Sequence, residues 1–389
     1  MKITKVECFP ISYPRVRPGA ETVGMPSLFV KIHTDEGIVG MGETGHIAED
    51  YIGSTQESNI AIIANLFAPK ILLGENPFNI EKIIGRMDVE TKNNNQAIDA
   101  VDSCLYDIMG KKLGVPVYQL IGGLTNPKIP LGLVISGNNP EELGKRAKDA
   151  LKAGFTSVKL KVGHMSRTTV EQDLANLRAV RHAIGDEPRL AIDANGGWDY
   201  FEALGALKKM EKFDLLMAEQ PVPWWDIDGL ARLRQKVDIP ICADESATEI
   251  SHLLQIIEKD AADVLFIKLA KVGGILKAQK WTALARAADL PVMCGCMGGS
   301  GFEVAHQGHF LAADEWMGRM EQENLGPMLL HNTFNTVTPE ITNDLSLNVP
   351  RYENGYFYPP DGPGLGVELN EAVLEKIITP GKRPVVVTA

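Results

Sequence analysis

The stretch SVKLKVG, residues 157–163, is the first of five apolar runs that each lead into a charged residue. The other four are LAIDANG (190–196), LLMAEQP (215–221), ICADES (241–246) and VLFIKLAK (264–271). Their charges are Lys161, Asp193, Glu219, Asp244 and Lys268. Because an isolated buried charge costs several kcal/mol or more, each must be solvated, paired or bound to a metal. The recurrence of this pattern predicts one shared site built from a repeated structural unit.

From about residue 128 the chain alternates between strand-like runs and amphipathic helical stretches. The expected strands are 129–135, 158–162, 190–195, 215–220, 241–245, 264–269 and 291–296, and the expected helices between them are 140–153, 169–184, 200–212, 226–236, 247–259 and 274–288. Repeated strand–helix units with short connections indicate a parallel sheet. At least seven units without a reversal favour a closed, modified (β/α)8 TIM-type barrel over an open doubly wound sheet, with an eighth, less regular strand near 317–322. Such a barrel carries its site at the carboxyl ends of its strands, where all five charges fall.

The residues before this region are typical of a separate α+β domain. Strand-like runs at 2–12, 26–34 and 38–43 include a hairpin turn signal at Asp35-Glu36-Gly37, and helical patterns follow at 58–67 and 95–113. The run at 383–388 is again β-like, and we expect it to return to this domain. The α/β chain should therefore consist of a capping domain of residues 1–125, completed by about 350–389, and a barrel of residues 126–349.

The composition is that of an ordinary globular protein, with 389 residues of which 44% are hydrophobic and 23% charged. The net charge of −11 argues against nucleic-acid binding, which needs clustered Lys and Arg against phosphates. No run approaches the roughly 18 apolar residues of a membrane span, and the N-terminus has no signal-peptide stretch. An odd number of cysteines, five, argues against a disulfide framework. We therefore expect a cytoplasmic protein with neither a membrane nor a nucleic-acid partner.

The three acids Asp193, Glu219 and Asp244 end consecutive expected strands, so they should converge at one barrel mouth. Three oxygen ligands suit Mg²⁺, or Mn²⁺, better than zinc. Asn195 lies two residues after Asp193 on the same strand face and is a candidate to support the metal or the substrate. Glu245, next to Asp244, should point elsewhere. The alternative is that the acids pair with lysines and only stabilise the barrel, but three in register on neighbouring strands favour a metal site.

Lys159 and Lys161 are two residues apart and should therefore point to the same side of one strand. Their repulsion and a nearby metal would lower their pKa values and free one of them to act as a base. Lys268 ends a strand roughly opposite in an eight-strand ring. One lysine on each face of a bound ligand allows a proton to be removed from one face and returned to the other. The alternative is a solvated surface cluster, which the apolar neighbours Val158 and Leu160 disfavour.

Together these motifs resemble the enolase superfamily, and within it the mandelate racemase/muconate-lactonizing-enzyme subgroup. The matching motifs are KLK (159–161), DAN (193–195), EQP (219–221), ADES (243–246) and IKLAKVGGI (267–275). The early GET (42–44) and LIGG (120–123) and the late PGLG (363–366) extend the resemblance over nearly the whole chain. Any one of these motifs alone is weak, whereas the combination is highly specific.

The resemblance implies a cap over a modified barrel that removes the proton α to the carboxylate of a small substrate, giving an enediolate. It implies Mg²⁺ ligands and catalytic groups as follows: Asp193, Glu219 and Asp244 bind the metal, Lys161 and Lys268 are the acid/base pair, and Lys159 assists Lys161. We expect an isomerase, either a racemase/epimerase or a cycloisomerase. A dehydratase with the same first step is the alternative, and a non-catalytic barrel binding protein is the competing class. By analogy with the family we also expect a homo-oligomer.

Specificity should come from the capping domain and the last barrel loops, where the sequence is least informative. Cap segments 15–25 and 45–51 are candidates, and the second offers His46 and Tyr51. Glu303 lies near a position where the family often places an acid. Glu321 and Glu323 resemble the paired acids by which dipeptide epimerases hold a substrate ammonium. The ENLGP stretch at 323–327 also resembles lactonizing enzymes, so the substrate stays open.

Overall fold

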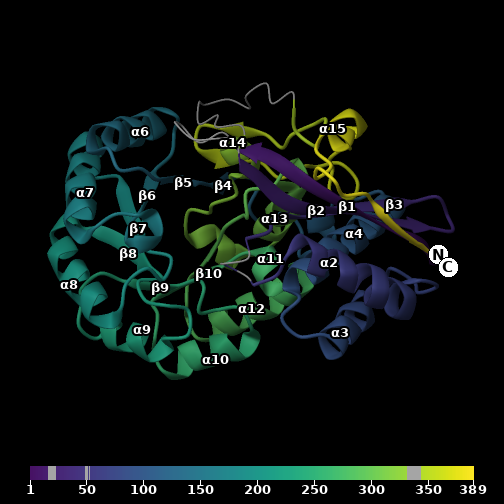
Figure 1. Cartoon of the computed structure of the whole chain (residues 1–389), viewed down its shortest axis with the longest axis horizontal. Helices are drawn as coiled ribbons and strands as arrows, with labels where there is room; N and C mark the ends of the chain where they lie inside the picture. The colour runs from purple at the N-terminus through teal and green to yellow at the C-terminus, as the bar shows by residue number, and fades with distance from the viewer. Residues whose placement is uncertain (16–22, 49–50, 52, 331–342) are drawn as a thin grey trace.

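The computed structural model describes residues 1–15, 23–48, 51, 53–330 and 343–389. Two domains lie side by side, an antiparallel sheet with helices and a ring of parallel strands surrounded by helices (Figure 1). The predicted class, a modified TIM-type barrel with an N-terminal α+β cap, is confirmed. Residues 16–22 of the candidate specificity segment 15–25, and residues 49 and 50 of the candidate segment 45–51, lie outside the described residues.

The cap is built on a four-stranded antiparallel sheet in the order β14-β1-β2-β3. Its strands are β1 (Ile3–Arg15), β2 (Val23–Thr34), β3 (Val39–His46) and β14 (Val385–Thr388). Val387 of β14 lies opposite Val6 of β1, so the end of the chain does return to this sheet. The cap helices are α2 (Gln56–Ile62), α3 (Ile80–Glu90), α4 (Asn95–Leu113) and α5 (Val117–Ile121).

The helix expected at 58–67 is not a single α-helix. α2 passes directly into a π-helix at Ile63–Leu72, in which the backbone N–H of Leu73 donates to the carbonyl of Ala68. Pro69 lies inside this wider segment and has no N–H to donate, so the regular hydrogen-bond ladder is interrupted there.

The long helix α4 connects the two domains. Residues such as Val101, Cys104 and Ile108 pack into a core shared with the cap sheet. Asn95, Asp99 and Asp102 are spaced four and three residues apart, so they share another face, and all three are buried. Contacts of Asn95 and Asp102 with barrel residues place this polar face toward the barrel.

The barrel contains a seven-stranded parallel sheet in the order β11-β10-β9-β8-β7-β6-β5. The strands are β5 (Gly132–Ile135), β6 (Ser157–Lys161), β7 (Arg189–Asp193), β8 (Leu215–Glu219), β9 (Ile241–Ala243), β10 (Val264–Ile267) and β11 (Val292–Cys294). The helices are α6 (Pro140–Lys152), α7 (Val170–Ile184), α8 (Tyr200–Met210), α9 (Ile227–Arg234), α10 (Ile250–Glu258), α11 (Leu269–Val272), α12 (Ile275–Ala287), α13 (Gly301–Ala313) and α14 (Gly326–Leu330). Each expected helix of this region, and each expected strand from 158–162 to 291–296, has its counterpart within a few residues at the ends.

Two residues close the ring between its edge strands. Gln322 pairs in parallel with Leu131, next to β5, and Glu323 pairs in parallel with Gly295, just after β11. The N–H of Gln322 donates to the carbonyl of Pro130 at 2.8 Å, and the N–H of Glu323 donates to the carbonyl of Cys294 at 2.9 Å. The eighth strand expected at 317–322 is therefore displaced and much shorter, because 3₁₀-helical backbone at Glu315–Arg319 occupies the first half of that range.

The strand expected at 129–135 is divided between two sheets. β4 (Ile129–Pro130) pairs with β13 (Tyr356–Phe357), which in turn pairs with β12 (Tyr352–Glu353), while β5 joins the barrel. A last helix, α15 (Glu371–Lys376), precedes β14. None of the helices in the described part of the chain has the length and apolar character of a transmembrane segment.

Candidate active site

Parallel register brings the predicted charges to one end of the barrel. Lys161 lies opposite Asp193 in the β6–β7 ladder, and Asp193 lies opposite Glu219 in the β7–β8 ladder. Glu219 lies opposite Cys242, so Asp244 projects from the same face of the next strand, two residues beyond. Lys268 directly follows β10. The five charges therefore share the mouth at the carboxyl ends of the strands.

Each of the three acids is buried, with at most 1% of its surface exposed, and each is paired with a lysine ammonium. Lys161 donates to Asp193, and Lys159 Nζ lies 2.5 Å from Glu219 Oε2. Lys268 Nζ lies 2.8 Å from Asp244 Oδ2. The cluster is thus a charge-balanced network in which three carboxyl groups and three lysines are held in close contact.

The pKa values of Glu219 and Asp244 shift in opposite directions in this environment. Burial raises the pKa of Glu219 well above its ordinary value, and repulsion from Asp193 and Asp244 adds to the rise, while Lys159 opposes it. Burial alone would also raise the pKa of Asp244, but the ammonium groups of Lys268 and Lys271 outweigh burial and hold that pKa below its usual range. Three buried carboxyl groups at adjacent strand ends thus concentrate negative charge between these strands.

Among the described residues, no three His, Cys, Asp or Glu side chains are already arranged around a common point as metal ligands. The reason is visible in the contacts, since Asp193, Glu219 and Asp244 are each turned toward a lysine. The donor set itself fits a hard divalent cation such as Mg²⁺ or Mn²⁺, because it offers three carboxylates from adjacent strand ends.

The two lysines of β6 have different environments. Lys159 is 3% exposed, and it lies 2.7 Å from Glu323 Oε1 in addition to its contact with Glu219. Burial alone would lower the pKa of Lys159, but Glu219 and Glu323 outweigh it and hold that pKa well above its ordinary value. The raised pKa of Lys159 differs from the lowering that we expected from its repulsion by Lys161, because each of the two lysines has its own carboxylate. The side chain of Lys161 is 28% exposed, so Lys161 is the lysine of this pair that faces the open mouth.

Two further predicted contacts, Tyr51 and Asn195, join the cluster. The hydroxyl of Tyr51, from the cap, donates to Asp244 Oδ2 at 2.5 Å and accepts from Lys268. Asn195 accepts from Lys161 Nζ at 2.8 Å and donates to Glu245 Oε1 at 2.9 Å. Glu245 therefore belongs to the rim of the site rather than pointing elsewhere. Burial and the charge of Asp244 raise the pKa of Glu245 to about 7.

Glu303 lies where the glycine-rich loop after β11 meets the cap. Its carboxylate accepts from the backbone N–H groups of Met297 and Gly299, both at 2.5 Å. Burial and the nearby charge of Glu43 raise the pKa of Glu303 to about 8. A side chain at Gly45 would overlap Glu303, so the cap approaches this carboxylate closely. His46, one residue further on, contacts the carbonyl of Pro26 at 3.2 Å through its ring Nδ1.

The structure does not bring Glu321 to the mouth, although Glu321 and Glu323 share a strand face. The carboxylate of Glu321 accepts from the hydroxyl of Thr156 at 3.0 Å and pairs with Arg189 at 2.8 Å. Thr156 precedes β6 and Arg189 begins β7, so Glu321 lies at the opposite, N-terminal end of the barrel. Two residues along a strand shift a side chain by one layer, which separates Glu321 from the mouth of the barrel.

Lys271 is a member of the site that the motif analysis did not single out. Its ammonium is fully buried and donates to Asp244 Oδ1, to the carbonyl of Asp244 at 2.6 Å and to the carbonyl of Phe266 at 2.7 Å. It lies three residues after Lys268, at the end of the one-turn helix α11. The available signal was a lysine inside the otherwise apolar LAKVGGI run, which had to be paired if it was buried.

Comparison with known proteins agrees with this arrangement. Residues 13–122 match the family model of the mandelate racemase/muconate lactonizing enzyme N-terminal domain, and residues 142–373 match that of the enolase C-terminal domain-like family. The chain therefore belongs to the mandelate racemase/muconate lactonizing enzyme family of the enolase superfamily.

Several relatives are similar over nearly the whole chain. An N-succinyl-L-Arg/Lys racemase of Bacillus cereus is 35% identical over 97% of this chain and 98% of its own length. An L-Ala-D/L-Glu epimerase of Clostridium acetobutylicum is 34% identical over 87% of this chain and 90% of its own. The crystal structure of a mandelate racemase/muconate lactonizing family protein from Azoarcus sp. EbN1 has a TM-score of 0.95 at 50% identity and covers all of both chains.

Proposed function

We propose that this chain is an isomerase that inverts the α-carbon of an N-acylated amino acid, with Mg²⁺ or Mn²⁺ held by Asp193, Glu219 and Asp244. One observation carries the proposal, namely the placement of Lys161 and Lys268. They come from β6 and β10, with the three acid-bearing strands between them in the ring. A substrate carboxylate directed toward the acids would therefore have one lysine on each side.

The chemistry follows from these positions. Lys161 Nζ, as the free amine, takes the α-proton on one face, and the electrons of that C–H bond move into the carboxylate to give an enediolate. The ammonium of Lys268 then delivers a proton to the opposite face, which inverts the centre. A divalent cation, when bound, would stabilise the enediolate where its charge develops. For the mirror-image substrate the two lysines exchange roles.

The substrate class rests on the relatives. The substrates in the names of the two relatives described above share a free carboxylate and an acylated α-nitrogen, supplied by succinate in one and by alanine in the other. The site offers a further argument for an acylated nitrogen. Lys159 already neutralises Glu323, so this carboxylate is engaged and a free substrate ammonium would compete with a buried lysine for it.

A cycloisomerase is the second candidate, since a muconate cycloisomerase of Acinetobacter baylyi is 28% identical over 96% of this chain. Both reactions pass through an enediolate, so they would share the metal ligands. They differ in that cycloisomerization also forms or breaks the C–O bond of a lactone ring. Dehydration of a hydroxy acid would use the same first step and give a 2-keto acid.

The test is a screen for Mg²⁺-dependent α-proton exchange in D₂O, followed by ¹H NMR and polarimetry. The panel contains N-succinyl-L-lysine and N-succinyl-D-lysine, other N-acyl amino acids, dipeptides and cis,cis-muconate. Inversion with incorporation of deuterium and without loss of water supports the proposal. The variants Lys161→Ala and Lys268→Ala should each stop inversion while each leaves exchange from one enantiomer. Full activity in both variants, or a 2-keto product, would contradict it.

A further inference from the structure

The two proposed bases are supported in different ways. Lys161 is the last residue of β6, which is hydrogen-bonded to β5 on one side and to β7 on the other. Lys268 follows β10 and is the N-terminal capping residue of α11, a helix of four residues. One helical turn has little stability of its own, because nucleation is unfavourable and few hydrogen bonds repay it. The position of Lys268 therefore depends on what holds α11 and the corner into α12.

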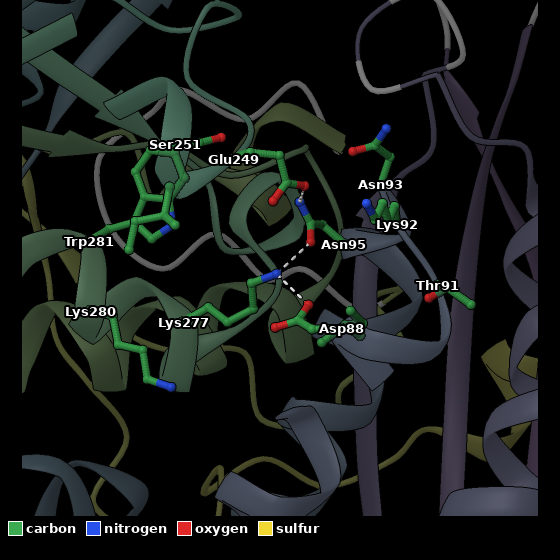
Figure 2. Close-up of a pocket in the computed structure, with 12 residues that line it drawn as sticks. Asp88, Thr91, Lys92, Asn93, Asn95, Glu249, Ser251, Lys277, Lys280 and Trp281 are labelled. Atoms are coloured by element: carbon green, nitrogen blue, oxygen red, sulfur yellow. Dashed lines mark hydrogen bonds and ion pairs between the residues drawn. The ribbon is translucent and has the colours of Figure 1, made fainter. Parts of the chain in front are cut away.

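Asn95 of the cap holds the C-terminal end of this turn. Its side-chain amide donates to the carbonyl of Lys271 at 2.8 Å and to the carbonyl of Thr248 at 3.1 Å. Its side-chain oxygen accepts from Lys277 Nζ at 2.9 Å. Figure 2 shows Asn95 between Glu249 and Lys277 on the wall of a cleft of about 430 Å³ between cap and barrel. Asn95 is only 5% exposed, so these contacts are shielded from solvent.

Asp102 of the same helix holds the start of α12. Its carboxylate accepts from the backbone N–H of Ile275 at 2.7 Å and from that of Leu276 at 3.3 Å. The residue at the N-cap position of α12 is Gly274, which has no side chain to cap the helix. Asp102 thus supplies, from the other domain, the cap that a Ser or Asp at that position would provide. The backbone of Gly274 has φ +91°, and a side chain there would overlap Asp102.

We propose that Asn95 and Asp102 are positioning residues for Lys268, so that the capping domain sets the geometry of one of the two bases. They fix the two ends of the α11–α12 corner, one at Lys271 and the other at Ile275. Among the residues that the structure describes, no cap side chain is hydrogen-bonded to β6, whose neighbours are strands of the barrel. Disturbing this face of α4 should therefore slow proton transfer on the Lys268 face of the substrate and spare the Lys161 face. The inference rests on the proposed two-base function.

The experiment measures α-proton exchange in D₂O separately from N-succinyl-L-lysine and N-succinyl-D-lysine. The enantiomer whose exchange Lys268→Ala abolishes defines the Lys268 face. In Asn95→Ala we expect exchange on that face to fall at least about tenfold, since displacement of a catalytic group by about 1 Å can cost 100-fold. Exchange on the Lys161 face should stay within about twofold. Asp102→Asn, which keeps one acceptor oxygen, should show the same selectivity with a smaller fall.

The matched control is Asn126→Ala. The side-chain amide of Asn126 also donates to two backbone carbonyls, those of Leu311 and Asp314, both at 2.8 Å, but it does so away from α11. This variant loses the same kind of contacts and should change neither face selectively. An equal fall on both faces in Asn95→Ala, or no fall, would overturn the inference.

A second measurement does not depend on the substrate. Competitive acetylation of the folded protein with acetic anhydride, analysed by mass spectrometry, gives the relative reactivity of Lys161 and Lys268. Asn95→Ala should change the reactivity of Lys268 and leave that of Lys161 unchanged. If the wild type exchanges neither enantiomer but this change is seen, the proposed function fails and the positioning role stands. An unchanged reactivity of Lys268 would overturn the positioning role itself.

Discussion

Replacing Lys271 by Met tests whether the charge network of the site also stabilises the fold. Lys271 has a fully buried side chain whose ammonium contacts the carboxylate of Asp244, the carbonyl of Asp244 and the carbonyl of Phe266. Methionine has a similar length and can fill the space, so the substitution removes mainly the charge and its hydrogen bonds. It leaves Asp244 buried with one fewer cation.

The size of the effect can be estimated from these contacts. Breaking a buried ion pair by removing one partner costs roughly 3–5 kcal/mol. Here the lower end applies, because Lys268 remains 2.8 Å from Asp244 and the Asp244 carbonyl still accepts from the N–H of Ala247 at 2.9 Å. We therefore expect a loss of about 3 kcal/mol in the free energy of unfolding. Lys280→Met is the matched control, since Lys280 pairs with Glu81 at 2.7 Å on the surface and such a pair contributes about 0–1 kcal/mol.

The assay is urea unfolding in EDTA, followed by tryptophan fluorescence and far-UV circular dichroism. Coincidence of the two transitions establishes whether a single step can be analysed in this two-domain chain. With an m value of about 3 kcal/mol/M, the midpoint of Lys271→Met should lie about 1 M below that of the wild type. Added Mg²⁺ should restore more stability to Lys271→Met than to Lys280→Met, because it places positive charge beside Asp244. Equal midpoints for the two variants would refute this reasoning.

Three further outcomes are expected. The pKa of Glu303 is raised from 4.5 to about 8, so the folded state holds this proton more tightly than the unfolded state. The associated stability is complete below pH 4.5 and is lost as the pH rises toward 8. In urea unfolding between pH 5 and 8, Glu303→Gln should therefore remove a slope of up to about 1.4 kcal/mol per pH unit from the free energy of unfolding. Glu321→Gln should lower stability without changing the activity of the folded enzyme, whereas Glu323→Gln, which leaves Lys159 with one fewer carboxylate, should lower turnover. EDTA should abolish α-proton exchange, and Mn²⁺ as well as Mg²⁺ should restore it; exchange that persists in EDTA would contradict a role for the metal.

The core of the site was predictable because burial and charge conflict at a few places in the sequence. An apolar run that ends in Asp193 or Lys268 must bring its charge to a shared polar site, and the parallel repeat fixes that site at one end of the barrel. The same reasoning applied to Lys271, but its long side chain reaches back to Asp244 from a helix. Strand periodicity does not describe such a path.

Other features depend on layers and pairings that a single sequence does not specify. Alternation shows that Glu321 and Glu323 share a face, but it does not show that one faces Lys159 and the other Arg189 at the far end. Likewise, a strand of two paired residues leaves no periodic pattern to detect. The contacts of Asn95 join segments that are more than 150 residues apart, so only the tertiary structure reveals them.

The two-residue closure of the barrel at Gln322 and Glu323 has a consequence for local unfolding. Only a few backbone hydrogen bonds hold the ring shut there, including those from the N–H groups of Gly132, Gln322 and Glu323. Native-state hydrogen exchange at these amides would therefore report opening of the ring separately from global unfolding. Because Glu323 is one of the two carboxylates that hold Lys159, each such opening would leave this lysine with Glu219 alone, and the exchange rate of these amides becomes a measure of how often the charge network loses a member.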